Sequence, residues 1–454
     1  MNDFPIFKVF ISDNNYFLYD TFYNRIYHIT KEYYEALLLL EKIGISGFLK
    51  LNRTDDAFKD IYEMINKGFI KSSFVEKIEH SETKNIPYLL ENCISYLLLQ
   101  VTKSCNFRCR YCVFANETTV ERQHSHENMP WSIAKHGIDF LYQHSRDSNQ
   151  IALAFYGGEP LLNFEIIEKS VLYIESLFYT KNVSYYITTN ASLLNEHIIN
   201  FFIEHDFFVT ISLDGPANIQ NSHRTPIDKQ IDSYQCVIDA INIIKEKDEN
   251  YFKSNVSFNS VIFPDENINY IDCFFQSQLK IDSKNYEINY ADMRGIDYLP
   301  QSDYPKLILD PVYRNMINKK EDERIRNLLV NHVGINPCYH PNGPCVPGVV
   351  RLFLSTDGTF YPCEKSPEKS CVSIGSLEKG LNIDKIIKFA NICQITEEQC
   401  RKCWAMRLCS MCVIKTIDHE KNFVSICEKM TYCQNAKKTI LESLKKEVLK
   451  HSIL

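Results

Sequence analysis

Three features that would place a protein on nucleic acid, in a membrane or outside the cell are missing from this 454-residue chain. Its 57 acidic residues outnumber its 50 basic ones, for a net charge of -7, whereas binders of nucleic acid or anionic membranes usually carry a basic excess. The longest apolar runs, such as residues 36–40, are far too short to span a bilayer. The opening MNDFPIFKVF lacks the basic region and apolar stretch of a secretory signal. We therefore expect a cytoplasmic protein that binds neither nucleic acid nor membranes.

Cysteine, in contrast, is abundant. The chain has 17 cysteines, most of them after residue 337. Because cytosolic thiols stay reduced, we do not expect these cysteines to form disulfides. A clustered set of reduced cysteines indicates metal binding.

The first part of the chain has the pattern of a small independent unit. Apolar residues at helical spacing predict helices over residues 33–40 and around residues 58–65. Strands rich in β-favouring residues precede them, at residues 7–12, 15–20 and 25–29. This order is typical of a winged-helix unit, although an accessory domain that merely packs is an alternative.

From residue 94 onwards, strand and helix patterns alternate, with helices expected, for example, at 133–144 and 231–245. Alternation of this kind predicts a parallel sheet in an α/β fold, here a partial (β/α)6 TIM-like barrel. In such barrels the chemistry lies on loops after the carboxyl ends of the strands. The predicted strands are residues 95–102, 150–157, 183–190, 207–214, 255–262 and 285–292.

The sequence CNFRCRYC directly follows the first of these strands. It supplies three thiols, from Cys105, Cys109 and Cys112, and no fourth thiol nearby. A structural zinc site closes at four ligands, and a [4Fe–4S] cluster is normally held by four thiolates. With three thiolates, one iron keeps an open position for another ligand. Zinc remains the alternative.

CxxxCxφC, with the aromatic Tyr111 at φ, resembles the signature of radical S-adenosylmethionine (SAM) enzymes. The resemblance implies that SAM binds the open iron and is cleaved to a 5′-deoxyadenosyl radical. Three later segments resemble further motifs of this family, although each alone could be an ordinary turn: GGEP at 157–160, ITTNASLL at 187–194 and SLDGP at 212–216. The cofactor-binding residues implied in this way are Tyr111, Gly157, Gly158, Glu159, Thr189, Asn190, Ser212, Asp214 and Arg224.

A second run of cysteines, CRKCWAMRLCSMC, spans residues 400–412 and in isolation could hold one zinc. With its flanking cysteines it resembles the SPASM extension of peptide-modifying radical enzymes, which implies two auxiliary [4Fe–4S] clusters. The usual run ends CxxxC, so the shorter spacing here affects the assignment of Cys412, and Cys371, Cys393 or Cys433 could substitute as a ligand. The implied ligands are Cys338, Cys345, Cys363 and Cys412 for the first cluster, and Cys400, Cys403, Cys409 and Cys427 for the second.

The segment 351–365 has an Asp-Gly pair between two apolar runs, which predicts a β-hairpin. Glu364 lies beside Cys363, where some relatives carry a proton-accepting carboxylate. By that resemblance Glu364 is the candidate catalytic residue. An equally weighted alternative is a solvated surface charge.

These resemblances predict a maturase of a ribosomally made, cysteine-rich peptide that forms thioether crosslinks, as in sactipeptides and ranthipeptides. They imply three [4Fe–4S] clusters, SAM, and a low-potential electron donor such as flavodoxin or ferredoxin. The amino-terminal unit would hold the leader of the precursor as an added edge strand. The alternatives are carbon–carbon crosslinking, epimerisation, formylglycine formation on sulfatases, or a zinc-binding interaction protein with an inactive barrel. The predicted divisions are a recognition unit (1–75), a linker (76–93), a barrel (94–300), a bridging segment (301–330), a SPASM domain (331–435) and a final helix (436–454).

Overall fold

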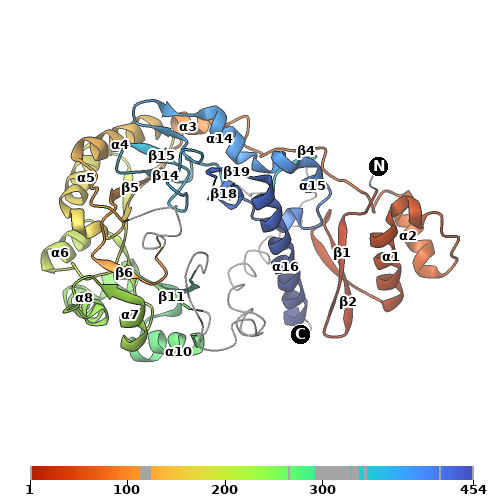
Figure 1. Ribbon diagram of the computed structural model, residues 1–454, viewed down its shortest axis with the longest axis horizontal. Helices are drawn as coiled ribbons and strands as arrows, with labels where there is room; N and C mark the ends of the chain where they lie inside the picture. Colours follow the sequence, from red (N-terminus) through yellow and green to blue (C-terminus); the bar gives the residue numbers. More distant parts are fainter. Residues whose placement is uncertain are drawn as a thin grey trace.

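The computed structural model describes residues 3–112, 124–263, 266–291, 329, 337–341, 345–418 and 421–451. Figure 1 shows an amino-terminal unit at one end and a curved sheet at the other. The long carboxyl-terminal helix α16 lies against the amino-terminal unit. The predicted bridging segment falls outside the described residues, apart from Leu329.

The amino-terminal unit is a three-stranded antiparallel sheet with two helices, as its sequence pattern predicts. Because strand residues alternate between faces, Phe7 and Val9 pack under the unit's own helices, whereas Phe10 and Phe17 pack toward α16. Both faces of the sheet are therefore covered. The elements are β1 (Phe7–Ser12), β2 (Asn15–Asp20), β3 (Arg25–Ile29), α1 (Lys31–Phe48) and α2 (Asp56–Asn66).

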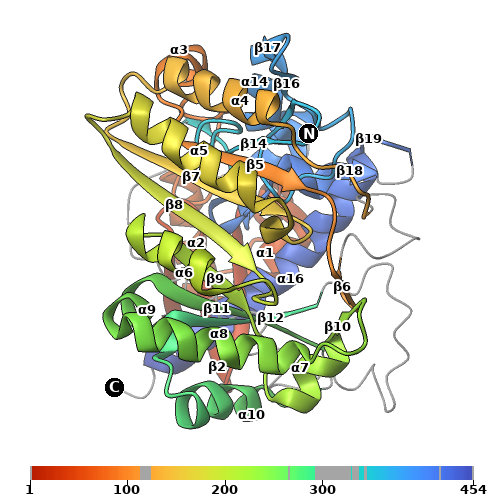
Figure 2. The same cartoon turned by 90° about the vertical axis from the view of Figure 1, so that its left-hand side faces the viewer.

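Six parallel strands form the central sheet, in the order β12-β11-β9-β8-β7-β5, and confirm the predicted partial barrel. Helices line the outer side of the curve, as Figures 1 and 2 show. The strands are β5 (Tyr96–Thr102), β7 (Gln150–Gly157), β8 (Asn182–Thr189), β9 (Phe208–Ser212), β11 (Val256–Ile262) and β12 (Tyr286–Tyr290), with a separate two-stranded sheet of β6 (Phe107–Cys109) and β10 (Arg224–Pro226). The helices are α4 (Trp131–His144), α5 (Phe164–Leu177), α6 (Glu196–Glu204), α7 (Ala217–His223), α8 (Ser233–Lys247), α9 (Glu249–Asn255) and α10 (Ile268–Cys273), with shorter helical segments at Pro160–Asn163, Phe274–Gln278 and Ser283–Asn285.

The cysteine-rich region continues this sheet, because β14 pairs in parallel with β5 and β15 follows it. The predicted hairpin is confirmed, and Gly358 takes the positive φ of 86° that its turn requires. The strands of this region are β13 (Cys338–Tyr339), β14 (Leu352–Leu354), β15 (Thr359–Tyr361), β16 (Gly375–Ser376), β17 (Gly380–Leu381), β18 (Ile417–Asp418) and β19 (Phe423–Val424). The helices are α14 (Ile383–Ala390), α15 (Glu397–Arg401) and α16 (Ile426–His451), with short turns at Ile392–Thr396, Met406–Leu408 and Val413–Thr416.

Two boundaries differ from the sequence prediction. The expected linker is folded, with β4 (Lys77–Ile78) paired to β13 and α3 (Ile86–Asn92) packed by its buried apolar residues. Its polar residues suggested a tether, but a few apolar side chains such as Ile78 suffice to anchor it. Helix α16 begins at Ile426 rather than near residue 436, with the Ser425 hydroxyl accepting a hydrogen bond from the Glu428 amide at 3.3 Å.

Candidate cluster and cofactor site

The three cysteines Cys105, Cys109 and Cys112, here called the cysteine triad, follow β5 at the carboxyl edge of the sheet. Each thiol lies within electrostatic range of the other two. Burial raises the pKa of Cys105 and of Cys109 to about 12, so both thiols stay protonated at neutral pH until a cation displaces the proton. This donor set fits three irons of a cubane cluster.

The described residues contain no group of three or more metal-ligating side chains tight enough for a single ion. A cubane spreads its thiolates over separate irons, so its ligands lie farther apart than those of one zinc. A cubane can therefore be held by thiols that do not converge on one point.

The loop before the triad is held by the glycines that end β7. A Cβ on Gly157 would lie 2.0 Å from the Thr102 carbonyl oxygen, and one on Gly158 would lie 2.2 Å from that of Ser104. The Gly158 amide donates to Thr102 O at 3.1 Å. The resemblance implied that these two glycines contact the cofactor. The structure shows that they let β7 contact the loop that carries Cys105.

Glu159 follows these glycines and is almost fully buried, with 1% of its surface exposed. Its carboxylate accepts hydrogen bonds from the Thr189 hydroxyl at 2.8 Å and from the Asn190 amide at 2.7 Å. Burial raises the pKa of Glu159 to about 7. The residue thus fastens the end of β7 to the end of β8. Since two carboxylate oxygens offer about four acceptor sites, there is capacity for a further donor.

The Asn190 side chain extends this connection to the triad loop. Its amide donates to the Asn106 side-chain oxygen at 2.9 Å, and Asn106 in turn donates to the Ser192 hydroxyl at 2.8 Å. Asn106 stands next to Cys105 in the chain. The predicted residues Glu159, Thr189 and Asn190 are therefore brought together beside the triad.

A buried ionic cluster lies on the other side of the triad. The Asp214 carboxylate accepts a hydrogen bond from the Tyr111 hydroxyl at 2.6 Å and forms an ion pair with Arg224 Nη2 at 3.1 Å. Although burial alone would raise the pKa of Asp214, Arg224 and these hydrogen bonds hold it below its usual value. Arg224 pairs along the β6–β10 ladder with Cys109, and its Nε is buried without a hydrogen-bond partner among the described residues. That orphaned donor is free to bind an anionic group. Ser212, at the end of β9, is also buried.

His223 completes this cluster and was not predicted. Its Nε2 lies 2.9 Å from Glu266 Oε1, and its Nδ1 lies 3.5 Å from Asp214 Oδ2. Burial alone would lower the pKa of His223, but the two carboxylates together raise it to about 9. The imidazole is therefore cationic at neutral pH. A single histidine beside Arg224 has no sequence pattern that reveals such a role.

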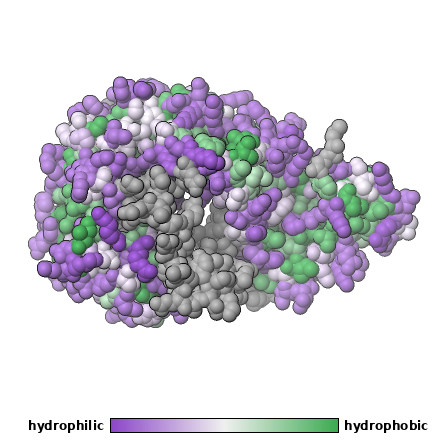
Figure 3. All heavy atoms as spheres, viewed as in Figure 1, coloured by the Kyte–Doolittle hydropathy of each residue, from purple (hydrophilic) through white to green (hydrophobic). Residues whose placement is uncertain are grey.

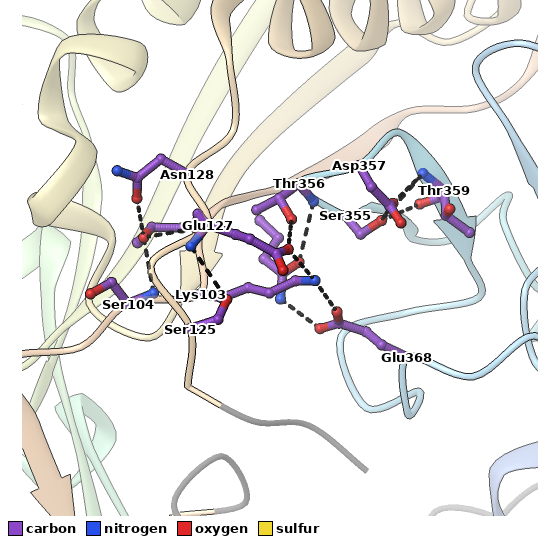
Figure 4. A network of polar contacts seen from close by, with 12 residues as sticks. Lys103, Ser104, Ser125, Glu127, Asn128, Ser355, Thr356, Asp357, Thr359 and Glu368 are labelled. Carbon is purple, nitrogen blue, oxygen red and sulfur yellow. Dashed lines mark hydrogen bonds and ion pairs between the residues drawn. The ribbon is translucent and has the colours of Figure 1, made fainter. Parts of the chain in front are cut away.

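A polar network joins the end of β5 to the cysteine-rich region (Figure 4). Lys103, two residues before Cys105, forms ion pairs with Glu127 at 2.8 Å and Glu368 at 3.3 Å. The Gln100 side chain donates to Glu368 at 2.6 Å and accepts from the Thr356 amide at 3.3 Å. This connection fixes the triad loop relative to the cysteine-rich extension. Sequence reasoning missed Glu368.

Glu364, the candidate catalytic residue, lies elsewhere. It forms an ion pair with Arg351, whose guanidinium lies 5.5 Å from the centre of the Tyr96 ring. Tyr96 begins β5, whereas the triad follows Thr102, and six strand residues span about 20 Å. Glu364 also lies within electrostatic range of the Cys363 thiol, and its catalytic role stays a prediction.

The carboxyl-terminal cysteines fall into two groups. Cys345, Cys363 and Cys412 lie within electrostatic range of one another, and burial with the neighbouring thiols raises the pKa of Cys345 to about 11. Two further predicted ligands are exposed: Cys338 lies on β13 beside Lys77, and Cys427 lies in the first turn of α16. The second group consists of Cys400, Cys403, Cys409 and Cys433.

Comparisons with known proteins agree with this geometry. Residues 99–276 match the radical SAM superfamily. None of the helices in the described ranges is long and apolar enough to cross a bilayer.

Two curated relatives span most of the chain. The radical SAM cyclopropyl synthase TigE of Paramaledivibacter caminithermalis is 23% identical, with 92% of this chain and 90% of the relative covered. The cysteine-type anaerobic sulfatase-maturating enzyme of Clostridium perfringens is 24% identical, with 76% and 94% covered. An uncharacterised protein of Methanocaldococcus jannaschii is 41% identical, but over only 27% of this chain and 39% of its own length.

The solved structure described as native anSMEcpe with bound AdoMet shares the fold. Its TM-score is 0.56 at 19% identity, and the match covers 78% of this chain and 98% of that one. A second structure of the same protein, with AdoMet and the Cp18Cys peptide, matches with the same TM-score at 20% identity, again covering 78% and 98%.

Proposed function

We propose that this chain is a peptide maturase that uses radical SAM chemistry to close thioether crosslinks in a ribosomally made, cysteine-rich peptide. The observation that carries the proposal is that three separate thiol groups occur in one molecule: the triad and two groups in the extension that continues the same sheet. Cys105, Cys109 and Cys112 would hold a [4Fe–4S] cluster, which with SAM bound would supply a 5′-deoxyadenosyl radical able to remove hydrogen from a peptide carbon.

The residues around the triad have the groups needed to bind SAM. Glu159 has acceptor capacity for the methionine ammonium, and the orphaned Arg224 Nε suits its carboxylate. Asp214 orients Arg224, and Asn190 holds the triad loop. Gly157 and Gly158, which have no Cβ, let that loop pack directly against the end of β7. The remaining predicted contacts, Tyr111, Thr189 and Ser212, lie at the same edge.

The carboxyl-terminal thiols suit two auxiliary clusters. The group of Cys345, Cys363 and Cys412, with the predicted fourth ligand Cys338, would hold one four-iron cluster. Electrons for SAM cleavage would come from a low-potential donor such as flavodoxin or ferredoxin.

The amino-terminal unit is suited to hold the leader of the precursor. Strand β3 is the edge of its sheet and is mostly exposed, with Tyr27 40% exposed. An extended peptide can add to such an edge through main-chain hydrogen bonds. Figure 3 shows apolar side chains at the surface of this unit, at the right of the view. Hydrogen bonds from Thr21 to Trp404 O at 2.8 Å and from Arg407 to Phe22 O at 2.7 Å dock the unit on the second cysteine group.

The test is co-expression with a short, cysteine-rich precursor peptide, sought among the reading frames next to the gene, followed by mass spectrometry. Each thioether removes two hydrogens and one thiol that iodoacetamide can alkylate. Loss of two hydrogens with all thiols still alkylatable would contradict thioether formation and indicate carbon–carbon crosslinking or cyclopropane formation.

The similarity to a cysteine-type sulfatase-maturating enzyme over 76% of this chain makes formylglycine formation a second candidate. That reaction would leave an aldehyde on a sulfatase peptide. Labelling with a hydrazide reagent distinguishes it from a thioether, which does not react.

A further inference from the structure

Four thiols lie close together around the start of α16. Cys400, Cys403, Cys409 and Cys433, here called the Cys433 quartet, each lie within electrostatic range of the other three. A fifth thiol, that of Cys393, shares a hydrogen bond with Cys400 and lies within electrostatic range of Cys409. The set therefore contains the number of thiols that one cubane needs, without Cys427.

The phase of α16 explains why Cys433 and not Cys427 joins the set. Residues four apart lie on the same helix face, so Lys429, Cys433 and Lys437 share one side. Lys429 and Lys437 both lie within electrostatic range of quartet thiols. Cys427, two residues before Lys429, projects from a different side and is exposed.

Lys429 is fully buried, with 0% of its surface exposed. Its ammonium donates to Cys400 Sγ at 3.4 Å and to the Thr396 hydroxyl. Within the ranges that the structure describes, it forms no ion pair with a carboxylate. A buried ammonium is costly unless an anionic group compensates it. The groups that face it are the thiols of Cys400, Cys393 and Cys433.

We propose that the Cys433 quartet holds the second auxiliary [4Fe–4S] cluster, with Cys433 as its fourth ligand in place of Cys427. Lys429 is a positioning residue that hydrogen-bonds the Cys400 sulfur and compensates the charge of the thiolate-bound cluster. Because the reduced cluster carries one more negative charge than the oxidised cluster, this cation raises the reduction potential. The inference rests on the proposed auxiliary clusters but not on any particular peptide.

Ligand identity is tested in a Cys105→Ala/Cys109→Ala/Cys112→Ala background, which removes the signal of the SAM cluster. After anoxic reconstitution, iron, sulfide and the electron paramagnetic resonance (EPR) spectrum are compared for Cys433→Ser, Cys427→Ser and Cys393→Ser. We expect Cys433→Ser alone to lose about four irons per chain, or to show a three-iron cluster. Iron loss in Cys427→Ser with full loading in Cys433→Ser would overturn the assignment, as would full loading in all three variants.

The role of Lys429 is tested by an EPR redox titration of the signal that Cys433→Ser removes. Lys429→Met keeps the chain length and removes the charge, Lys429→Arg keeps the charge, and Lys438→Met changes an exposed lysine of the same helix. We expect a lower potential in Lys429→Met only. An unchanged potential would refute the role of Lys429, and so would loss of all clusters together, because that result shows general support of the fold. These measurements use no peptide, so failure of the proposed peptide chemistry would leave them unaffected.

Discussion

Replacing Gly158 by alanine tests how closely the proposed SAM site depends on the contact between β7 and the triad loop. The new Cβ would lie 2.2 Å from Ser104 O and 2.9 Å from Cys105 Cβ. The Ser104 oxygen is held by the Glu159 amide at 2.9 Å, so the loop must move by about 1 Å or more to reach ordinary contact distance. Overpacking of this kind costs about 1–3 kcal/mol. Because Cys105 moves with the loop, we expect the triad to lose its cluster.

The assay is iron content and 5′-deoxyadenosine formation after anoxic reconstitution, together with urea unfolding. Gly158→Ala should lose about four irons per chain and nearly all SAM cleavage while keeping the carboxyl-terminal clusters. Gly380→Ala is the matched control, because Gly380 has a positive φ of 70° but nothing within 4 Å of a new Cβ. It should lose about 1–2 kcal/mol of stability and no iron. Full iron and normal SAM cleavage in Gly158→Ala would refute the reasoning.

Four further predictions concern other changes to the chain. Replacing Cys105, Cys109 and Cys112 together by alanine should abolish 5′-deoxyadenosine formation and preserve the auxiliary clusters, and retained cleavage would contradict the assignment of the triad. Asp214→Asn should lower the free energy of unfolding by about 3–5 kcal/mol, because it leaves Arg224 and His223 buried without their shared carboxylate; a loss below 1 kcal/mol in urea unfolding would contradict this. Since the pKa of His223 is raised to about 9 in the folded state, its stabilisation is complete below about pH 6.5 and is lost as the pH rises through 9; His223→Gln should flatten the fall in stability over that range. Tyr27→Asp on the edge of β3 should weaken binding of the leader peptide, measured by fluorescence anisotropy, and leave SAM cleavage without peptide unchanged.

The strands and the triad were predictable because their signals are local. Alternating apolar residues predicted β1, β2 and β3 with their observed bounds. The strand pattern of β5, followed directly by three cysteines, predicted the position of the cluster site. The folded linker was missed because Ile78 and Ile86 are isolated apolar residues whose partners lie far away in the sequence. Deleting residues 1–75 to test leader binding would also expose Ile440 and Leu444, the α16 residues that pack against this unit. A single substitution on β3 is therefore the cleaner test of leader binding.

The cysteines around α16 could not be assigned as cluster ligands from the sequence alone. The helix was expected to begin near residue 436, which left Cys427 and Cys433 without a defined helix face. Once α16 begins at Ile426, helical phase separates the two cysteines and places Lys429 beside the quartet. His223 and Glu368 were missed for a related reason: a single polar residue gives no periodic signal, and only the fold shows what faces it.

SAM cleavage by the metal-loaded protein tests the central claim most directly. Purified full-length chain, reconstituted without oxygen, is reduced with dithionite and incubated with SAM. The account predicts a brown protein with about twelve irons per chain, four for each cubane, that forms 5′-deoxyadenosine and methionine. A colourless protein that binds zinc and forms no 5′-deoxyadenosine would contradict it.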